Sequence, residues 1–284
     1  MKCYLECIPC FVKQAVEAGN ILLSSGKQRE EILQKCLKLI INMDRDMTPP
    51  EAGMKIHSII KFITGKKDPY KKIKDYYNDR GPEFYKRYKG KVAKSKDRLL
   101  AAVRCAIAGN VVDFGVAGEF DAEKDIEKVM TQDFAYSDYD AFRDILSKSR
   151  SVLYLADNVP ETFFDRILIE ELGDKEITYA VRSAPIINDA TVEDALIAGI
   201  DRIARVVESG SCAPGTVLSL CSADFLEIIR KSDVIISKGQ GNYEALEDIK
   251  GKDVFFMLKA KCKVVAKHLN VKIGDIIFRY NNRK

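Results

Sequence analysis

Asp157, Asn158 and Asp189 are the residues of this sequence whose types and spacing most directly suggest chemistry. Asp157 and Asn158 follow the apolar run Val152 to Ala156, and Asp189 comes shortly after the run Ile177 to Val181. Because ligands bind outside the carboxyl ends of the strands in open α/β sheets, these side chains are expected to form one group. Carboxylate and amide oxygens are the ligands that Mg²⁺ and Mn²⁺ prefer, and Co²⁺ and Ni²⁺ can also use them. The spacing therefore predicts a divalent metal site.

Lysines and glycines follow two further runs of the same kind. Lys238 and Asn242 frame the segment KGQGN after Val234 to Ser237, and Lys259 follows Val254 to Leu258. Lysine side chains and backbone amides beside glycine suit a phosphate ester. Each feature alone has a simpler explanation, because glycine can serve a turn, lysine can cover an edge strand, and Asp-Asn is a good helix N-cap. The joint placement at strand ends favours a phosphate and metal site.

Three more polar residues lie near these strand ends or within an apolar stretch. Asn110 and Asp113 interrupt the apolar helical segment AIAGNVVDFGV, and Glu161 lies on the helix expected after Asp157 and Asn158. Buried polar side chains need hydrogen-bond partners. Asn110 and Asp113 therefore predict either a structural network or a reach into the cleft.

Cys3, Cys7 and Cys10 have the spacing that radical enzymes use to hold an iron–sulfur cluster. In those enzymes the motif lies on a loop after a barrel strand, whereas here it opens a helical segment. A structural zinc or iron would need ligands from elsewhere, and His57 and His268 are the only histidines. Buried thiols in a reducing compartment are the simpler expectation.

The elements that must position these residues change in character near residue 149. From Pro9 to about Leu146 the apolar residues recur at helical spacing, without short strand-like runs. After Ser149, β-branched and aromatic runs alternate with amphipathic helices, which is typical of a parallel sheet flanked by helices. The sequence thus predicts an α/β protein with a helical N-terminal domain, 1–148, and a Rossmann-like parallel sheet domain, 149–284. A fifth run, Ile203 to Val207, is the weakest of the predicted strands.

The composition excludes several classes of protein. The 284 residues are 46% hydrophobic and 31% charged, which suits a globular core, and the formal charge of +4 indicates no nucleic-acid or membrane partner. No signal peptide opens the sequence, and no run reaches the roughly 18 apolar residues that a membrane span needs. We expect a cytoplasmic protein whose partner is a small phosphorylated metabolite. The oligomeric state is left open.

Six ordered motifs resemble the DUF89 or damage-control phosphatase family, whose eukaryotic branch includes the protein called acidic residue methyltransferase. These motifs are KCYLECIPCF, AGNVVDFGV, LADNVPETFFD, IINDATVEDA, SKGQGNYEAL and FFMLKAKC. The cysteine motif near the start resembles that of a prokaryotic-type member. The sequence departs from the family at Val159 and Pro160, where relatives commonly carry a small residue and glycine.

The resemblance implies a helical domain on a Rossmann-like sheet and metal-dependent hydrolysis of phosphate monoesters. Sugar phosphates and damaged phosphometabolites are the implied substrates. The resemblance implies catalytic roles for Asp157, Asn158 and Asp189 as the metal ligands and for Lys259 as a phosphate contact. The positions that it places near the substrate are Asn110, Asp113, Glu161, Lys238 and Asn242.

The function that follows is a metal-dependent phosphatase acting on phosphate monoesters of small metabolites. Attack by water is favoured over attack by Asp157, because Val159 stands where an Asp-x-Asp pair would have its second aspartate. Methyl transfer is disfavoured, since no glycine-rich cofactor loop follows the first run. Two alternatives remain: a non-catalytic metabolite- or nucleotide-binding module that uses the same metal site, and a redox or cluster protein built on the N-terminal cysteines.

Overall fold

A seven-stranded, mostly parallel sheet organises the computed structural model, which describes residues 1–110 and 122–282. Asp113, one of the predicted substrate-binding residues, lies outside these ranges. The strand order is β1-β7-β6-β5-β2-β3-β4, and only the β6–β7 pair is antiparallel among the strands described. The strands are β1 Phe134–Ser137, β2 Ser151–Leu155, β3 Glu176–Val181, β4 Arg205–Glu208, β5 Val234–Lys238, β6 Asp253–Lys259 and β7 Ile276–Tyr280.

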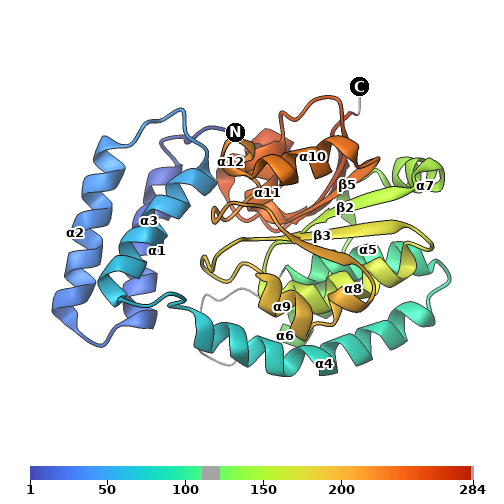
Figure 1. The fold of residues 1–284 in the computed structure, drawn as a ribbon, viewed down its shortest axis with the longest axis horizontal. Helices are drawn as coiled ribbons and strands as arrows, with labels where there is room; N and C mark the ends of the chain where they lie inside the picture. The colour runs from blue at the N-terminus through green and yellow to red at the C-terminus, as the bar shows by residue number, and fades with distance from the viewer. Residues whose placement is uncertain (111–121, 283–284) are drawn as a thin grey trace.

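Helices cover both faces of this sheet, and three more form a separate layer at its edge (Figure 1). The helices of the first half are α1 Cys7–Leu22, α2 Gly26–Asn42, α3 Pro49–Thr64, α4 Lys71–Ala93, α5 Arg98–Gly109, α6 Ala122–Thr131 and α7 Tyr139–Lys148. The helices of the second half are α8 Thr162–Glu171, α9 Val192–Ile197, α10 Ala223–Lys231, α11 Gly239–Leu246 and α12 Lys263–Leu269. Within the described ranges, no helix is long and apolar enough to cross a membrane.

The central strands are apolar on both faces because helices bury both faces. In β2, Val152 and Tyr154 belong to the cluster formed with α5 and α8. Leu153 and Leu155 belong to the opposite cluster, formed with α10, α11 and α12. A strand that is buried on both faces is a continuous run of hydrophobic residues. The central strands could therefore be predicted from the sequence.

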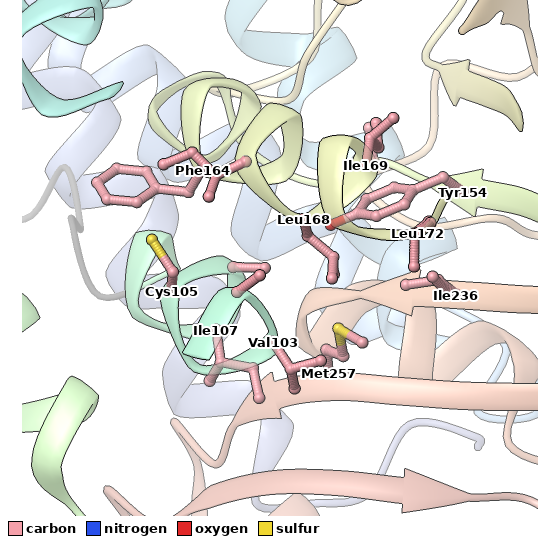
Figure 2. Packing of buried hydrophobic residues seen from close by; sticks show 14 of the residues in the cluster. Val103, Cys105, Ile107, Tyr154, Phe164, Leu168, Ile169, Leu172, Ile236 and Met257 are labelled. Carbon is pink, nitrogen blue, oxygen red and sulfur yellow. The ribbon is translucent and has the colours of Figure 1, made fainter. Parts of the chain in front are cut away.

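Helices α5 and α8 pack against each other and against one face of the sheet (Figure 2). Val103 and Ile107 of α5 and Leu168 of α8 are fully buried there. Gly109 allows the close approach of the two helices, because a Cβ at this position would lie 2.9 Å from the ring of Phe164. This packing fixes the start of α8, which follows the predicted metal-binding loop.

Helices α1, α2 and α3 build a core of their own beside the sheet (Figure 1). Helix α3 begins with Pro49 and Pro50 in its first turn and a capping box between Thr48 and Glu51. The helices of residues 1–148 thus divide between two cores, because α5 and α7 pack on the sheet.

The predicted α/β class is confirmed, and the five expected strands are present as β2 to β6. Sequence analysis missed β1 and β7. Strand β1 is a four-residue strand in the half that was predicted to be helical, and its alternate residues are exposed. So short a run at the edge of a sheet carries little periodicity to recognise.

The order of the strands creates a crevice between β2 and β5. The chain continues from β2 to β3 and β4 on one side, whereas β5 and β6 lie on the other side. Loops that leave β2 and β5 therefore diverge at the carboxyl edge, which is where open α/β sheets bind ligands.

We predict that Leu168→Ala lowers the free energy of unfolding by about 2–5 kcal/mol, because it leaves a cavity between α8 and the sheet. Leu168 is fully buried, whereas Leu196, the control position, is 50% exposed. Urea unfolding of both alanine variants measures the difference. Equal losses for the two variants would contradict the packing described here.

Candidate active site at the carboxyl edge of the sheet

Asp157, Asn158 and Asp189 meet at this crevice. The backbone joins their two loops, because Ala190 N–H donates to the Asp157 carbonyl at 2.8 Å and Val159 N–H donates to the Asn188 carbonyl at 2.8 Å. An isolated antiparallel bridge pairs Asn158 with Asp189. The predicted convergence of these three residues is thus present in the structure.

Each carboxylate of the site is held through one oxygen. Asp157 Oδ2 accepts hydrogen bonds from Asn110 Nδ2 at 2.9 Å and from Asn158 Nδ2 at 3.1 Å. Asp189 Oδ2 accepts one from Arg182 Nε at 2.7 Å. The Oδ1 atoms of Asp157 and Asp189 accept no hydrogen bond from a described residue, although the Arg182 guanidinium lies 4.0 Å from Asp157 Oδ1. One oxygen of each aspartate is therefore available to a ligand.

A fully buried ion-pair network lies directly beneath these residues. Lys238 Nζ donates to Glu161 Oε2 at 2.7 Å and to Asp165 Oδ1 at 2.6 Å. The hydroxyls of Tyr154 and Tyr179 donate to Asp165 at 2.6 and 2.8 Å. Glu161 Oε1 accepts in turn from Asn158 and Asn110, so the network reaches the loop of Asp157 and Asn158 that is predicted to bind metal.

The buried charges of this region do not balance. Among the described residues, the buried carboxylates Asp157, Asp189, Glu161 and Asp165 are paired with two buried cations, Lys238 and Arg182, so these six groups have a formal charge of −2 when all are ionised. Burying uncompensated charge is costly. One divalent cation would neutralise the excess.

The pKa directions reflect the same excess. Burial, followed by the charges of Glu161 and Asp189, raises the pKa of Asp157 well above its ordinary value. Burial also raises the pKa of Asp189, and the ion pair with Arg182 opposes that rise. For Lys238, burial alone would lower the pKa, but Asp165 and Glu161 outweigh it and raise the pKa.

The donor set fits a hard cation with water completing its shell. Among the described residues, no group of three His, Cys, Asp or Glu side chains is arranged to hold a metal ion. A cation here would take the two aspartate oxygens, the amide oxygen of Asn158 and water. Mg²⁺ characteristically keeps several waters and binds few protein carboxylates, and Mn²⁺ accepts the same oxygen ligands.

Gly239 brings the start of α11 against the carboxylate of Asp157. Its φ is +78°, and a Cβ there would lie 1.8 Å from Asp157 Oδ2. Any other residue would therefore displace the carboxylate and strain the backbone. The helix N-terminus, with its unsatisfied backbone amides, thus faces the site.

Asn242 and Arg182 tie the two sides of the crevice together. Asn242 Nδ2 donates to the carbonyls of Ala156 at 3.0 Å and Lys238 at 2.7 Å, at the ends of β2 and β5. Asn242 Oδ1 accepts from Thr216 N–H at 2.8 Å and from Arg182 at 3.3 Å. Asn242 is fully buried, so it supports the loops and does not face solvent.

A cleft of about 720 Å³ opens above the aspartates, between the sheet edge and helices α1 and α3. Asp157, Asn158 and Asp189 line it, as do Gln240 and Gly241 of α11. The cleft is also lined by Cys7, Cys10, Glu244, Lys261 and Cys262.

Four of the predicted substrate-binding residues lie beneath this cleft and do not line it. Asn110, Glu161, Lys238 and Asn242 are each 1% exposed or less. Lys238 is the last residue of β5, Asn242 and Glu161 follow the ends of β5 and β2, and Asn110 follows helix α5. The side chains of all four point into the network that supports the site. In this structure these side chains take part in that network, and their contact with substrate stays a prediction.

Lys259 also does not line the cleft, whereas Lys261 does. Lys259 ends β6, opposite Ile276 of β7, and is half-buried. By the alternation of the strand it shares a face with Phe255 and Met257, which pack in the cluster with α5 and α8. The role predicted for Lys259 remains a prediction.

Arg182, Asp165 and Lys261 are the polar residues of the site that sequence analysis did not assign. Arg182 follows β3, and Asp165 lies one turn after Glu161, so their positions at strand and helix ends were visible. The partners of Arg182 and Asp165 were not, because Arg182 donates to Asn242 of α11 and Asp165 pairs with Lys238 of β5. The motif LKAK contains both Lys259 and Lys261. Strand alternation alone does not show which of the two faces the cleft.

Within the described ranges, the cysteines of the N-terminal motif belong to no group of three His, Cys, Asp or Glu side chains that could hold a metal ion. Cys3 and Cys7 are buried in the core of α1–α3, and Cys10 lines the cleft. Cys262, from the start of α12, lines the same cleft. In the part of the chain that is described, all eight cysteines are free thiols.

The fold and the site define an α/β protein with a cleft at the switch point of its sheet, where Asp157 and Asp189 line the cleft. Residues 3–277 match the model of the damage-control phosphatase ARMT1-like domain. The chain therefore belongs to this family, which confirms the resemblance drawn from the motifs.

Relatives of similar length support this assignment. A damage-control phosphatase of Pyrococcus horikoshii is 34% identical over 291 residues, covering 100% of both chains. A damage-control phosphatase of Archaeoglobus fulgidus is 29% identical over 285 residues, covering 98% of both chains. The crystal structure of a DUF89 family protein from Pyrococcus horikoshii superposes with a TM-score of 0.88 at 33% identity, covering 99% of this chain and 100% of that one.

We predict that Lys238→Met lowers the free energy of unfolding by about 3–5 kcal/mol, since it leaves Glu161 and Asp165 buried without their cation. The double variant Lys238→Met, Asp165→Asn should recover part of the loss, because it removes one of the two carboxylates. Urea unfolding in chelator measures both.

The matched control is Lys231→Met, whose exposed ion pair with Glu227 should contribute nothing measurable. A Lys238→Met variant as stable as this control would contradict the assignment of Lys238 to the supporting network.

Proposed function

We propose that this chain is a divalent-metal-dependent phosphatase that hydrolyses phosphate monoesters of small metabolites, including damaged ones. The observation that carries the proposal is the excess of buried carboxylates at a cleft. Two of these carboxylates, Asp157 and Asp189, each keep an oxygen that accepts no hydrogen bond from a described residue. The names of the two damage-control phosphatases from archaea support the reaction type.

The metal site consists of Asp157, Asn158 and Asp189 in this proposal. A divalent ion bound there would polarise a phosphoryl oxygen and lower the pKa of a bound water. Asn110 and Asn158 orient the Asp157 carboxylate through their hydrogen bonds to Oδ2. Arg182 orients Asp189 in the same way. These contacts keep the reacting geometry fixed without contacting the substrate.

In this proposal two positively polarised groups bind the phosphate in the cleft: the side chain of Lys261 and the N-terminus of α11. Lys261 lines the cleft and lies near enough to Asp157 to lower the pKa of that carboxyl. The N-terminus of α11 adds backbone N–H groups at Gln240 and Gly241, which line the same cleft. A cation beside the equatorial oxygens stabilises the charge that builds up as phosphate is transferred.

The function is tested by incubating the pure chain with small phosphate monoesters and Mn²⁺, Mg²⁺, Co²⁺ or Ni²⁺, and measuring phosphate release. We expect release that depends on the ion and stops with chelator. Tight binding of a phosphorylated metabolite without any release would instead favour a non-catalytic binding module.

Asp157→Ala should fold and lose both activity and stabilisation by Mn²⁺. The substitution removes one of several buried like charges, so stability in chelator should stay the same or rise. Thermal unfolding with and without Mn²⁺, together with phosphate release, measures these effects. Asp174→Ala is the control, because Asp174 lies in the exposed loop before β3, at the opposite edge of the sheet. It should leave phosphate release, stability in chelator and stabilisation by Mn²⁺ unchanged.

Retained stabilisation by Mn²⁺ in Asp157→Ala would place the metal elsewhere. Loss of folding would return Asp157 to the role of a helix cap.

Lys261→Met should reduce kcat/KM by about 10²–10³, because the methionine keeps the apolar stem but removes the charge near the phosphate. Lys259→Met is the matched comparison, two residues earlier in the same motif. Steady-state kinetics with a small sugar phosphate and Mn²⁺ compares them. A large loss in Lys259→Met with none in Lys261→Met would support the assignment made from the family motif and contradict the one made from the cleft.

A further inference from the structure

Glu244 is a buried acid in the cleft wall that the proposed function does not use. It lies on α11, one turn after Gln240, and lines the same cleft as Asp157 and Asp189. Gln240 Nε2 donates to Glu244 Oε1 at 2.8 Å, while Gln240 Oε1 accepts from the backbone N–H of Lys261 at 3.0 Å. Gln240 therefore holds the Glu244 side chain in a fixed position relative to the backbone of Lys261.

The surroundings of the Glu244 carboxyl contain thiols in place of an ion-pair partner. Cys7 and Cys10 approach it from α1, Cys3 from the N-terminal segment and Cys262 from the start of α12. The N-terminal ammonium of Met1 donates to the Glu244 backbone carbonyl at 2.6 Å. That ammonium forms its ion pair with Glu247, at 3.3 Å.

This environment favours the neutral acid. Burial raises the pKa of Glu244 to about 7, and the hydrogen bond from Gln240 and the charge of the chain terminus oppose the rise only in part. A group that is half protonated near neutral pH is suited to proton transfer.

The position of Glu244 relative to Asp157 suggests what it would contact. Gly239, the first residue of α11, touches the Asp157 carboxylate, and Glu244 follows five residues later. At about 1.5 Å per residue, Glu244 lies roughly 7–8 Å further along the helix axis. A phosphoryl group held at Asp157 and Lys261 would thus direct the alcohol part of its ester along the cleft, toward Glu244.

We propose that Glu244 is the general acid for the alcohol that leaves the phosphate ester. The inference rests on the proposed phosphatase function. As the bond between phosphorus and the ester oxygen breaks, its electron pair stays on the alcohol oxygen, which takes the proton from the Glu244 carboxyl. Water supplies the new oxygen on phosphorus and releases its proton to solvent, from which Glu244 is protonated again. The products are the neutral alcohol and inorganic phosphate.

The test compares two esters that differ in their need for a proton. The alcohol of glycerol 3-phosphate must be protonated as it leaves, whereas p-nitrophenyl phosphate releases a stable phenolate. Glu244→Gln retains the shape and hydrogen bonding of the side chain but cannot transfer a proton. With Mn²⁺ present, we expect it to lose about 10²-fold or more in kcat/KM on glycerol 3-phosphate and little on p-nitrophenyl phosphate.

Glu247→Gln is the control, since Glu247 follows α11 directly but does not line the cleft. It should leave both activities unchanged. Equal losses of Glu244→Gln on both esters, or no loss on either, would overturn the role of Glu244 alone. A wild-type chain inactive on both esters would overturn the phosphatase proposal and this one with it.

The pH dependence of the wild-type chain tests the inference without any substitution. Glu244 is protonated below its pKa of about 7, so the general acid is lost as the pH rises through that value. The ratio of kcat/KM for glycerol 3-phosphate to that for p-nitrophenyl phosphate should fall above about pH 7, and effects common to both esters cancel in the ratio. A ratio that is independent of pH, or one that Glu244→Gln leaves pH-dependent, would contradict the assignment.

Discussion

The structure of this protein is built around an excess of negative charge that is buried at the switch point of its sheet. Asp157, Asp189, Glu161 and Asp165 are all 9% exposed or less, with Lys238 and Arg182 as their buried counter-charges. Such an arrangement is unfavourable unless hydrogen bonds and a bound cation compensate for it. The surrounding elements supply these hydrogen bonds, and in the proposed function a divalent cation supplies the remaining positive charge.

The parts of the site depend on one another through this requirement. Lys238 neutralises the lower pair of carboxylates, so Glu161 can orient Asn158 and Asn110 beside Asp157. Residue 239 must be a glycine, because α11 begins there against the carboxylate of Asp157 and leaves no room for a side chain. The buried ion pairs of Lys238 and the carboxylate of Asp157 therefore belong to one hydrogen-bonded network. In this network the buried ion pairs support the residues that line the cleft.

The cleft joins two environments of different chemistry along helix α11. At the start of the helix, carboxylate oxygens and the nearby Lys261 suit a cation and a phosphate. One turn further along, Glu244 lies among thiols that carry no charge in their protonated form. A small phosphate ester would span both, with its phosphate at the charged end and its alcohol at the end where a neutral acid is favoured. The helical layer of α1–α3 closes the second end, which gives the N-terminal cysteine motif a place in the site.

The sequence by itself determined the central strands and the place of the site, because strands buried on both faces must be apolar and polar residues must follow where they end. It thereby located Asp157, Asn158 and Asp189, and its ordered motifs identified the family. Only the tertiary structure decided which polar residues face the cleft. Lys238 finds its partner Glu161 77 residues away in the sequence, and no local pattern encodes such a pairing. Likewise Glu244 reaches the cleft through the packing of α11 against β6 and α3, and Lys261 lines it from the segment that follows β6, whereas the short edge strand β1 exists only because β7 pairs with it.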